Sequence, residues 1–450
     1  AGQRCSALRV LYVQNEVAQR VVEMLTGAMN TLVVGDPWRP ETDVGPVIDR
    51  AAQADITAYC AAAEREGRLI ARRPAPDDGT FAAPAMISVG GIDDVPREVF
   101  GPVLHVARFS AGDLDAVVDA INARRFGLTF GLHTRIDDRV EAVVARIRVG
   151  NVYVNRNQIG AVVGSQPFGG EGLSGTGPKA GGPTYLDRFI APAQDTSGGE
   201  ASRSFGETEA ATGLAGLTGG AGPGPAACPA AGAGARAPNA DHAPLRGVAL
   251  KDVLRLAAIP ARGDAMKAAM ALPGAADGMF SRREVQAIAE AQTRAATGLD
   301  MPGPTGESNR LTFHPRGAIV CLGPRTCDVE RQAIAALALG NSVLVAADAL
   351  ERVLRHLPDG LEVRNRVFAV DRTWLVPHHL TSADPIAGVM YDARTDDFEA
   401  VRRALSAREG PIVPLVLSLL EVDRLLVERH VCVDTTAAGG NARLLAESAR

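Results

Sequence analysis

Residues 128–154 read LTFGLHTRIDDRVEAVVARIRVGNVYV, and this stretch decides the fold class. Its β-branched and aromatic ends predict strands over 128–133 and 151–154, and the apolar spacing between them predicts a helix over 139–147. Strand–helix–strand units of this kind are typical of an α/β fold with a largely parallel sheet. The preceding residues repeat the pattern: strands are predicted over 7–13 and 99–106, and helices over 48–66, over 113–125 and from the N-cap Asn15 to residue 29.

The composition then changes twice along the chain. From 192 to 244, Gly, Ala, Ser, Thr and Pro dominate, and such a segment buries too little apolar surface to offset its ordering entropy. A flexible linker is therefore expected there. Globular patterning resumes afterwards, with strands expected over 311–322 and 342–346 and a helix over 329–339. The expected organisation is one α/β unit over 1–191, a linker over 192–244 and a second α/β unit over 245–450.

Composition and charge exclude several classes of protein. The formal net charge of −5 on 450 residues argues against nucleic-acid binding, which needs a basic surface. No apolar run is long enough for a transmembrane helix. Six scattered cysteines do not make a disulfide framework, so a cytoplasmic location is expected. No Cys/His cluster has zinc spacing, and no metal site is expected. The chain opens on Ala1 without the features of a signal peptide, and we interpret it as a fragment.

Three segments contain candidate chemistry. Cys5 stands on a short loop beside Arg4, and a nearby cation can stabilise a nucleophilic thiolate. Read alone, a single cysteine is more often a small buried apolar residue, and Glu98 is a solvated acid at the start of a strand. The run QPFGGEGLSG at 166–175 is, read alone, a loop that needs positive φ. It lacks the GxGxxG spacing of a phosphate-binding turn.

Taken together, in this order and spacing, the segments resemble the C-terminal half of an aldehyde dehydrogenase. GQRC at 2–5 is similar to that family's nucleophile motif, and it is followed by EVFGP at 98–102, NVYVN at 151–155 and PFGG at 167–170. The run QIGAVVGSQPFGGEGLSGTGPKAGGPTY at 158–185 resembles the L-glutamate-γ-semialdehyde dehydrogenase module of the bifunctional proline utilization A flavoenzymes. PGPTGESN at 302–309 and DTTAAGGNA at 434–442 are similar to the extra C-terminal domain of the long members of that family.

The resemblance implies an activity and a cofactor. The reaction is the NAD-dependent oxidation of L-glutamate γ-semialdehyde, formed from 1-pyrroline-5-carboxylate, to L-glutamate through a thiohemiacetal and a thioester. Cys5 matches the nucleophile, and its own backbone N–H matches half of the oxyanion hole. Glu98 matches the acid that binds the nicotinamide ribose, and Phe100 matches the residue beside the nicotinamide ring. These contacts position the cofactor rather than take part in bond making.

The resemblance also implies how the substrate is bound. Gly160 and Ala161 match positions whose backbone N–H groups hold the α-carboxylate, and small residues allow a carboxylate to approach the backbone closely. Without their neighbours, these two residues would be interpreted as a plain surface turn. Ser6 matches a hydroxyl donor to the same carboxylate. Phe168 matches an aromatic wall around the aliphatic stem of the substrate.

The same resemblance places several parts of the enzyme before Cys5, outside this chain. They are the general-base glutamate, the oxyanion asparagine and an FAD-containing proline dehydrogenase module, so the fragment alone is expected to be inactive. Residues 321–348 resemble a degenerate copy of the family's NAD-binding segment, with Thr326 in place of the oxyanion asparagine and Ala346-Ala347 in place of a Lys-Pro pair. The second unit is therefore expected to be a Rossmann-type domain without chemistry of its own, which covers the active site or serves assembly. A homo-oligomer is expected.

Two alternatives remain open at this stage. The first is an aldehyde dehydrogenase of broader specificity, and the second is a non-catalytic scaffold in which both α/β units serve only assembly. The presence of both Cys5 and Glu98 favours an enzyme, because a relic would be expected to have lost one of them, as residues 321–348 lost theirs.

Overall fold

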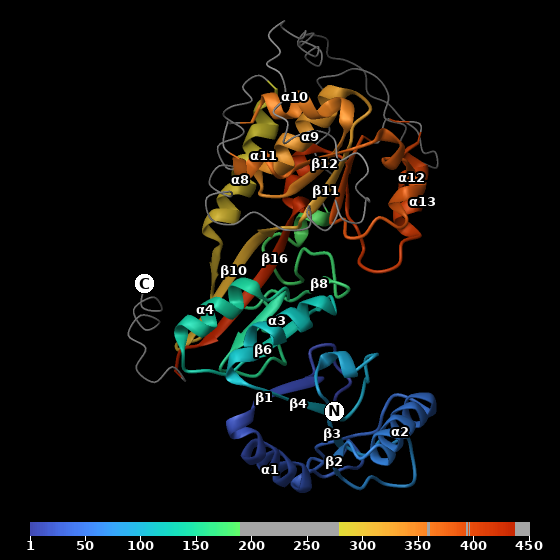
Figure 1. The fold of residues 1–450 in the computed structure, drawn as a ribbon. Coiled ribbons are helices and arrows are strands. Elements are labelled where there is room, and N and C mark those ends of the chain that lie inside the picture. Colours follow the sequence, from blue (N-terminus) through green and yellow to red (C-terminus); the bar gives the residue numbers. More distant parts are fainter. Residues whose placement is uncertain (190–278, 358–360, 393–394, 396, 437–450) are drawn as a thin grey trace, which may run out of the picture.

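The structure, a computed structural model, describes residues 1–189, 279–357, 361–392, 395 and 397–436. The linker expected over 192–244 and the beginning of the expected second unit lie outside these residues. Figure 1 shows three tiers: a lower tier from the first part of the chain, a middle tier around β6, and an upper tier from the C-terminal part. The long strands β10 and β16 run from the upper tier into the middle one.

The lower tier is a four-stranded sheet with a helix on each face. Its order is β1-β4-β3-β2, where β2 is antiparallel to β3 and the other pairs are parallel. The strands are β1 (Val10–Gln14), β2 (Leu69–Arg72), β3 (Ala85–Ser88) and β4 (Val103–Phe109). Alternate side chains of these strands pack against α1 (Asn15–Thr31) on one face and against α2 (Arg50–Arg65) on the other.

Three expectations for this tier need correction. Asn15 is the first helical residue of α1 and not its N-cap, and its side-chain amide donates to Ser110 Oγ at 3.0 Å. The strand expected over 99–106 is β4, which begins only at Val103, so Glu98 lies in an irregular loop before the strand. The helix expected over 48–66 begins at Arg50, because the carboxylate of Asp49 caps it by accepting from the backbone N–H of Ala52 at 2.7 Å.

The middle tier contains one sheet built from both parts of the chain. Its order is β6-β7-β16-β10-β9, in which β7 pairs in parallel with both β6 and β16. Helices α3 (Leu114–Ala123) and α4 (Asp137–Arg146) cover one face of this sheet. The strands are β6 (Thr129–Leu132), β7 (Asn151–Val154), β9 (Leu299–Met301), β10 (Glu307–Pro315) and β16 (Leu426–Asp434). A separate short pair joins β5 (Phe126–Gly127) to β8 (Glu171–Gly172).

The upper tier is a parallel sheet with helices on both faces. Its order is β13-β12-β11-β14-β15, which is the 3-2-1-4-5 arrangement of a doubly wound Rossmann-type sheet. The strands are β11 (Ala318–Leu322), β12 (Ser342–Ala346), β13 (Val367–Val370), β14 (Gly388–Tyr391) and β15 (Leu415–Val416). Helices α8 (Arg282–Thr297), α9 (Thr326–Ala338) and α10 (Leu350–Arg355) pack on one face. Helices α12 (Pro377–Leu380) and α13 (Phe398–Ser406) pack on the other, and α11 (Leu361–Arg364) precedes β13.

The strand expected over 311–322 is in fact two strands in different sheets. The chain turns at Arg316 and Gly317, between β10 and β11. The buried guanidinium of Arg316 donates to the carbonyl oxygens of Arg424 and Thr176, each at 2.5 Å. These bonds hold the turn in place where the middle and upper tiers meet.

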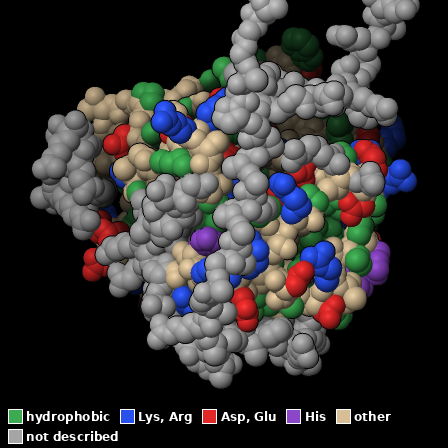
Figure 2. All heavy atoms as spheres, turned by 90° about the horizontal axis from the view of Figure 1, so that it is seen from above, with side chains coloured by type: hydrophobic (Ala, Val, Ile, Leu, Met, Phe, Trp, Pro, Cys, Tyr) green, Lys and Arg blue, Asp and Glu red, His purple; other side chains and the backbone are tan. Residues whose placement is uncertain are grey.

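On the face shown in Figure 2, positive and negative side chains are interspersed over the described residues rather than gathered by sign. In the part of the chain that the structure describes, no helix is both long and apolar enough to cross a membrane. Cys5, Cys60, Cys321 and Cys432 are free thiols, whereas Cys327 is disulfide-bonded.

Candidate active site

The loop that precedes β1 presents the thiol of Cys5 to solvent. Cys5 lies in a tight turn closed by a hydrogen bond of 3.0 Å from the backbone N–H of Ala7 to the carbonyl of Arg4. The neighbouring Ser6 is buried. The backbone N–H of Cys5 donates to no acceptor among the described residues. An exposed thiol beside a free N–H can react with a small electrophile and stabilise the oxygen that becomes negative.

The nucleophile loop packs directly against the segment that contains Glu98 and Phe100. Gly2 has φ of +70°, and a Cβ placed on it would lie 1.8 Å from the carbonyl oxygen of Gly101. Only glycine at position 2 allows the two backbones to come this close. Two motifs almost a hundred residues apart in the chain are therefore brought together, as the resemblance implied.

Arg9 connects the two segments, although no motif in the sequence had indicated it. Its Nε lies 3.2 Å from Oε1 of Glu98, while Nη1 and Nη2 donate to the carbonyls of Gly2 and Arg4 at 2.5 and 2.9 Å. The guanidinium carbon lies 4.6 Å from the centre of the Phe100 ring. The position of Arg9 four residues after Cys5 is the signal that could have indicated it, because an arginine so close to a nucleophile can hold the loop.

The backbone of Arg9 is fixed as well. Its carbonyl oxygen accepts hydrogen bonds from the backbone N–H and from Nδ1 of His105, at 3.1 and 2.8 Å. Burial lowers the pKa of His105, which favours the neutral ring. Nε2 of that ring lies 2.9 Å from the hydroxyl of Tyr59. Strand β4 and helix α2 thereby hold the base of the nucleophile loop.

Glu98 and Phe100 are accessible despite these contacts. The Glu98 side chain is 52% exposed, and Phe100 is 44% exposed. An accessible carboxylate next to an accessible aromatic ring, both adjoining the Cys5 loop, can contact a flat ligand that has hydroxyl groups.

The loop after β7 reaches the nucleophile loop through Gln158. Its side-chain amide donates to the carbonyl of Ser6 at 3.2 Å. Gly160, exposed and with φ of +83°, has no other atom near the place of a Cβ, and Ala161 is half-buried. The backbone N–H groups of Gly160 and Ala161 donate to no acceptor among the described residues. Two adjacent free donors in such a loop can bind a carboxylate.

Phe168 lies in the segment that follows this loop. It forms a two-way backbone bridge with Ala180, at 2.9 Å in each direction. Its side chain is half-buried, and the described residues show no hydrogen bond or ring contact that joins it to Cys5 or Ser6. The structure thus brings together Cys5, Ser6, Glu98, Phe100 and the 158–161 loop, and among the described residues neither a hydrogen bond nor a ring contact joins Phe168 to them.

The described residues of the upper tier contain no exposed free thiol like that of Cys5. Cys321 is fully buried in β11, and burial raises the pKa of its thiol. At the first turn of α9, Thr326 is followed by Asp328, whose carboxylate accepts from the backbone N–H of Arg325 at 3.2 Å. An acid at this position occupies the helix N-terminus where a Rossmann-type fold binds phosphate.

A metal site is not evident either. Among the residues that the structure describes, no group of three or more His, Cys, Asp or Glu side chains could hold a metal ion.

Comparisons with known proteins agree with this arrangement. The aldehyde dehydrogenase family matches residues 1–193. The bifunctional protein PutA of Escherichia coli is 37% identical over 471 residues, covering 99% of this chain and 31% of that protein. The 1-pyrroline-5-carboxylate dehydrogenase of Bacillus subtilis is 38% identical over 191 residues, covering 41% of this chain and 36% of that protein. The chain therefore spans about a third of the length of these curated relatives.

A solved structure extends the likeness of fold to the C-terminal part. The structure of proline utilization A from Corynebacterium freiburgense covers 96% of this chain and 36% of that chain, with a TM-score of 0.53 and 20% identity. At this identity the match shows the fold alone, and it includes both parts of the chain. Residues 1–193 form a domain of the aldehyde dehydrogenase family, and the chain is homologous to the C-terminal part of the PutA proteins.

Proposed function

We propose that this chain supplies the nucleophile, the cofactor-binding acid and the substrate loop of an NAD-dependent L-glutamate-γ-semialdehyde dehydrogenase of proline catabolism. The observation that supports this most directly is the junction at Ser6. Cys5, whose thiol is exposed, directly precedes Ser6, and the carbonyl of Ser6 accepts the hydrogen bond from Gln158 of the 158–161 loop. The names of the relatives, PutA and 1-pyrroline-5-carboxylate dehydrogenase, point to the same reaction.

Cys5 is the nucleophile in this proposal. Its thiolate attacks the aldehyde carbon, a carbon–sulfur bond forms, and the electron pair of the C=O bond moves to oxygen. The free backbone N–H of Cys5 donates to that oxygen as its negative charge develops. Oxidation converts the thiohemiacetal to a thioester on Cys5, and water releases the product as a carboxylate and regenerates the thiol.

Glu98 and Phe100 fit a nicotinamide cofactor. The accessible carboxylate can accept hydrogen bonds from two ribose hydroxyls, and the accessible ring offers a flat apolar surface beside it. NAD, when bound, supplies the acceptor for the hydride. The residues of this chain hold it and set its distance from the Cys5 loop through Arg9.

The free N–H groups of Gly160 and Ala161 bind the α-carboxylate of the substrate. Ser6 donates to the same group, and Phe168 borders the aliphatic stem. These two roles follow the resemblance. The carboxylate donors are what would distinguish this substrate from a simple aldehyde.

The remaining parts of the complete enzyme follow the resemblance as well. We place the general-base glutamate and the oxyanion asparagine in a segment that residues 1–450 do not contain. We place FAD in a proline dehydrogenase part, and the whole enzyme in the cytoplasm as a homo-oligomer. The upper tier has no catalytic role of its own, which the buried Cys321 and the acid Asp328 at the start of α9 support.

The test uses the complete gene product that contains this chain. It should form NADH and glutamate from glutamate semialdehyde, and Cys5→Ser should lose both while still binding NAD. Cys60→Ala, a change at a buried thiol of α2, is the matched control and should retain activity. Glutamate formation that survives in Cys5→Ser would contradict the proposal. Equal kcat/KM for propanal and glutamate semialdehyde would favour an aldehyde dehydrogenase of broader specificity, and no NADH with either would favour a scaffold.

A further inference from the structure

The substrate loop is tied at both ends to one carboxylate from the C-terminal part of the chain. The loop leaves β7 at Arg156 and ends at Gln166. Glu307, the first residue of β10, pairs with Arg156 through one carboxylate oxygen and accepts a hydrogen bond of 2.8 Å from the side-chain amide of Gln166 through the other. Arg156 and Gln166 are 151 and 141 residues away from Glu307 in sequence.

Gln166 transmits this contact to the donors of the loop. Its amide oxygen accepts from the backbone N–H of Val162 at 3.2 Å, and its own backbone N–H donates to the carbonyl of Val162 at 2.7 Å. Val162 directly follows the donor pair Gly160-Ala161. The Gln166 side chain is buried. Its amide oxygen bonds to the turn at Val162, and its amide nitrogen bonds to Glu307.

The charge of Glu307 is stable in this setting. Its side chain is 16% exposed, and that of Arg156 is 19% exposed. Burial raises the pKa of the Glu307 carboxyl, but hydrogen bonds from Asn309 and Gln166 and the charge of Arg156 outweigh it, so the pKa is lower than its ordinary value. The guanidinium of Arg156 is in turn held 5.5 Å above the ring of Tyr153 in β7.

We propose that Glu307 is a positioning residue for substrate specificity: by joining Arg156 to Gln166, it holds the 157–165 loop in the shape in which Gly160 and Ala161 can bind a carboxylate. This inference rests on the proposed function. It gives the C-terminal part a specific task in recognising the substrate, although no residue of that part need touch the substrate. Donors that are held in place before binding bind more tightly, because less conformational entropy is lost when the ligand arrives.

The test compares two aldehydes in the complete gene product. Glu307→Gln keeps the size of the side chain but loses the charge-assisted bond to Arg156. It should raise KM for glutamate semialdehyde about tenfold, with kcat changed less than about twofold. KM for propanal, which has no carboxylate, should stay the same. Glu399→Gln, which breaks an exposed ion pair with Arg402 on α13, is the matched control and should change neither constant.

A reciprocal exchange tests the contact itself. Gln166→Glu alone places two carboxylates face to face and should raise KM for glutamate semialdehyde. Combining it with Glu307→Gln restores one donor and one acceptor between the two side chains, so the double variant should recover most of the loss. Amide hydrogen exchange gives a readout besides activity: exchange at Val162 should be faster in Glu307→Gln than in the parent protein.

Three results would overturn the inference while leaving the proposed function standing. They are an unchanged KM for glutamate semialdehyde in Glu307→Gln, an equal loss with both aldehydes, and no recovery in the double variant. A complete gene product that does not oxidise glutamate semialdehyde at all would instead overturn the proposed function.

Discussion

The guanidinium of Arg9 joins the nucleophile loop to Glu98. Its Nε lies 3.2 Å from the Glu98 carboxylate, and its two terminal nitrogens bind backbone carbonyls on either side of Gln3, in the loop that contains Cys5. One side chain thereby connects the loop of the proposed nucleophile to the acid proposed to hold the cofactor.

Replacing Arg9 by Met should impair both NAD binding and turnover. The change removes donors to two loop carbonyls and a partner of Glu98, and a charge-assisted hydrogen bond contributes about 1.5–3 kcal/mol. We expect the Kd for NAD to rise about tenfold, with a fall in kcat, measured by calorimetry and steady-state kinetics. Arg97 is the sequence neighbour of Glu98 and forms an ion pair with Asp55. Arg97→Met, which breaks this pair, should have little effect on the Kd for NAD or on kcat. Equal effects of the two substitutions would argue against a specific role of Arg9.

Cys5 should be alkylated before the other free thiols. Cys5 is exposed, whereas Cys60, Cys321 and Cys432 are buried, and burial raises the pKa of each of those three thiols. A short treatment with iodoacetamide, followed by peptide mass mapping, should label the peptide that contains Cys5 first. First labelling at Cys60 or Cys432 would show that the Cys5 loop is covered in solution.

Glu98→Gln should weaken cofactor use without altering proton transfer. The amide keeps one acceptor oxygen but cannot form charge-assisted bonds with two hydroxyls. KM for NAD should rise, while the pH profile of kcat keeps the same limbs as in the parent enzyme. A lost or displaced basic limb would instead assign a proton-transfer role to Glu98.

His430 should make the folded state sensitive to acid. The ring is fully buried in β16, and burial, together with the nearby charge of Lys179, lowers its pKa to about 4. In the unfolded chain the pKa is about 6.5, so between those values the unfolded state binds more protons and stability falls as the pH falls. As the pH falls over this range, the free energy of unfolding measured with urea should decrease more steeply in the parent protein than in His430→Leu.

His430→Asn provides the control for this comparison. Asn does not titrate, so its stability should follow the same pH dependence as His430→Leu even if its absolute stability is lower. Parallel curves for the parent protein and both variants would mean that His430 does not remain neutral when the protein folds.

Much of the fold could be predicted from local patterns, and the misses have physical causes. The strand 151–154 and the strand 342–346 are confirmed as β7 and β12, because a short β-branched run between turn residues specifies a buried strand. The run 311–322 was interpreted as one strand, although Pro315, Arg316 and Gly317 interrupt its apolar residues where the structure has the break. Its break depends on Arg316, whose partners Arg424 and Thr176 are more than a hundred residues away.

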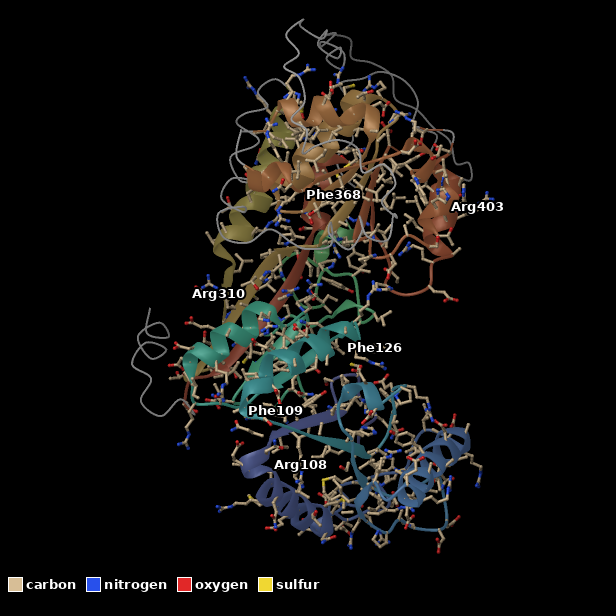
Figure 3. The ribbon with its side chains drawn as sticks, in the orientation of Figure 1. Arg108, Phe109, Phe126, Arg310, Phe368 and Arg403 are labelled. Atoms are coloured by element: carbon tan, nitrogen blue, oxygen red, sulfur yellow. The ribbon has the colours of Figure 1, made fainter. Side chains whose placement is uncertain are left out.

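The junction of the two parts could not be predicted in this way. Strand β16 adds to β7 in the same sheet as β6, and no periodicity within one part of the chain reports a strand supplied by the other. Figure 3 shows Arg310 on the long strand that descends beside α4, with Phe126, the first residue of β5, in the same tier. The boundaries 1–191 and 245–450 stay predictions, since they fall at or near residues outside the described ranges.

Some residues of the candidate site could be predicted from motifs, and others depend on contacts between residues far apart in sequence. The positions of Cys5 and Glu98 followed from a resemblance carried by motifs, and the close approach of Gly2 and Gly101 agrees with it. Arg9 and Glu307 were missed because their importance lies in partners 89 and 141 residues away, which a sequence alone does not reveal. A charged residue near a motif becomes informative only when the fold shows what it binds.

The most direct test of the central claim is the kinetics of Ala161→Val in the complete gene product. A β-branched side chain at 161 should push the substrate carboxylate away from the free N–H groups of the loop. KM for glutamate semialdehyde should therefore rise at least about tenfold, since losing both donors would cost on the order of 3–6 kcal/mol. Propanal never uses these donors and should be oxidised with nearly unchanged constants. Equal losses with the two aldehydes would contradict the claim that this loop recognises a carboxylate.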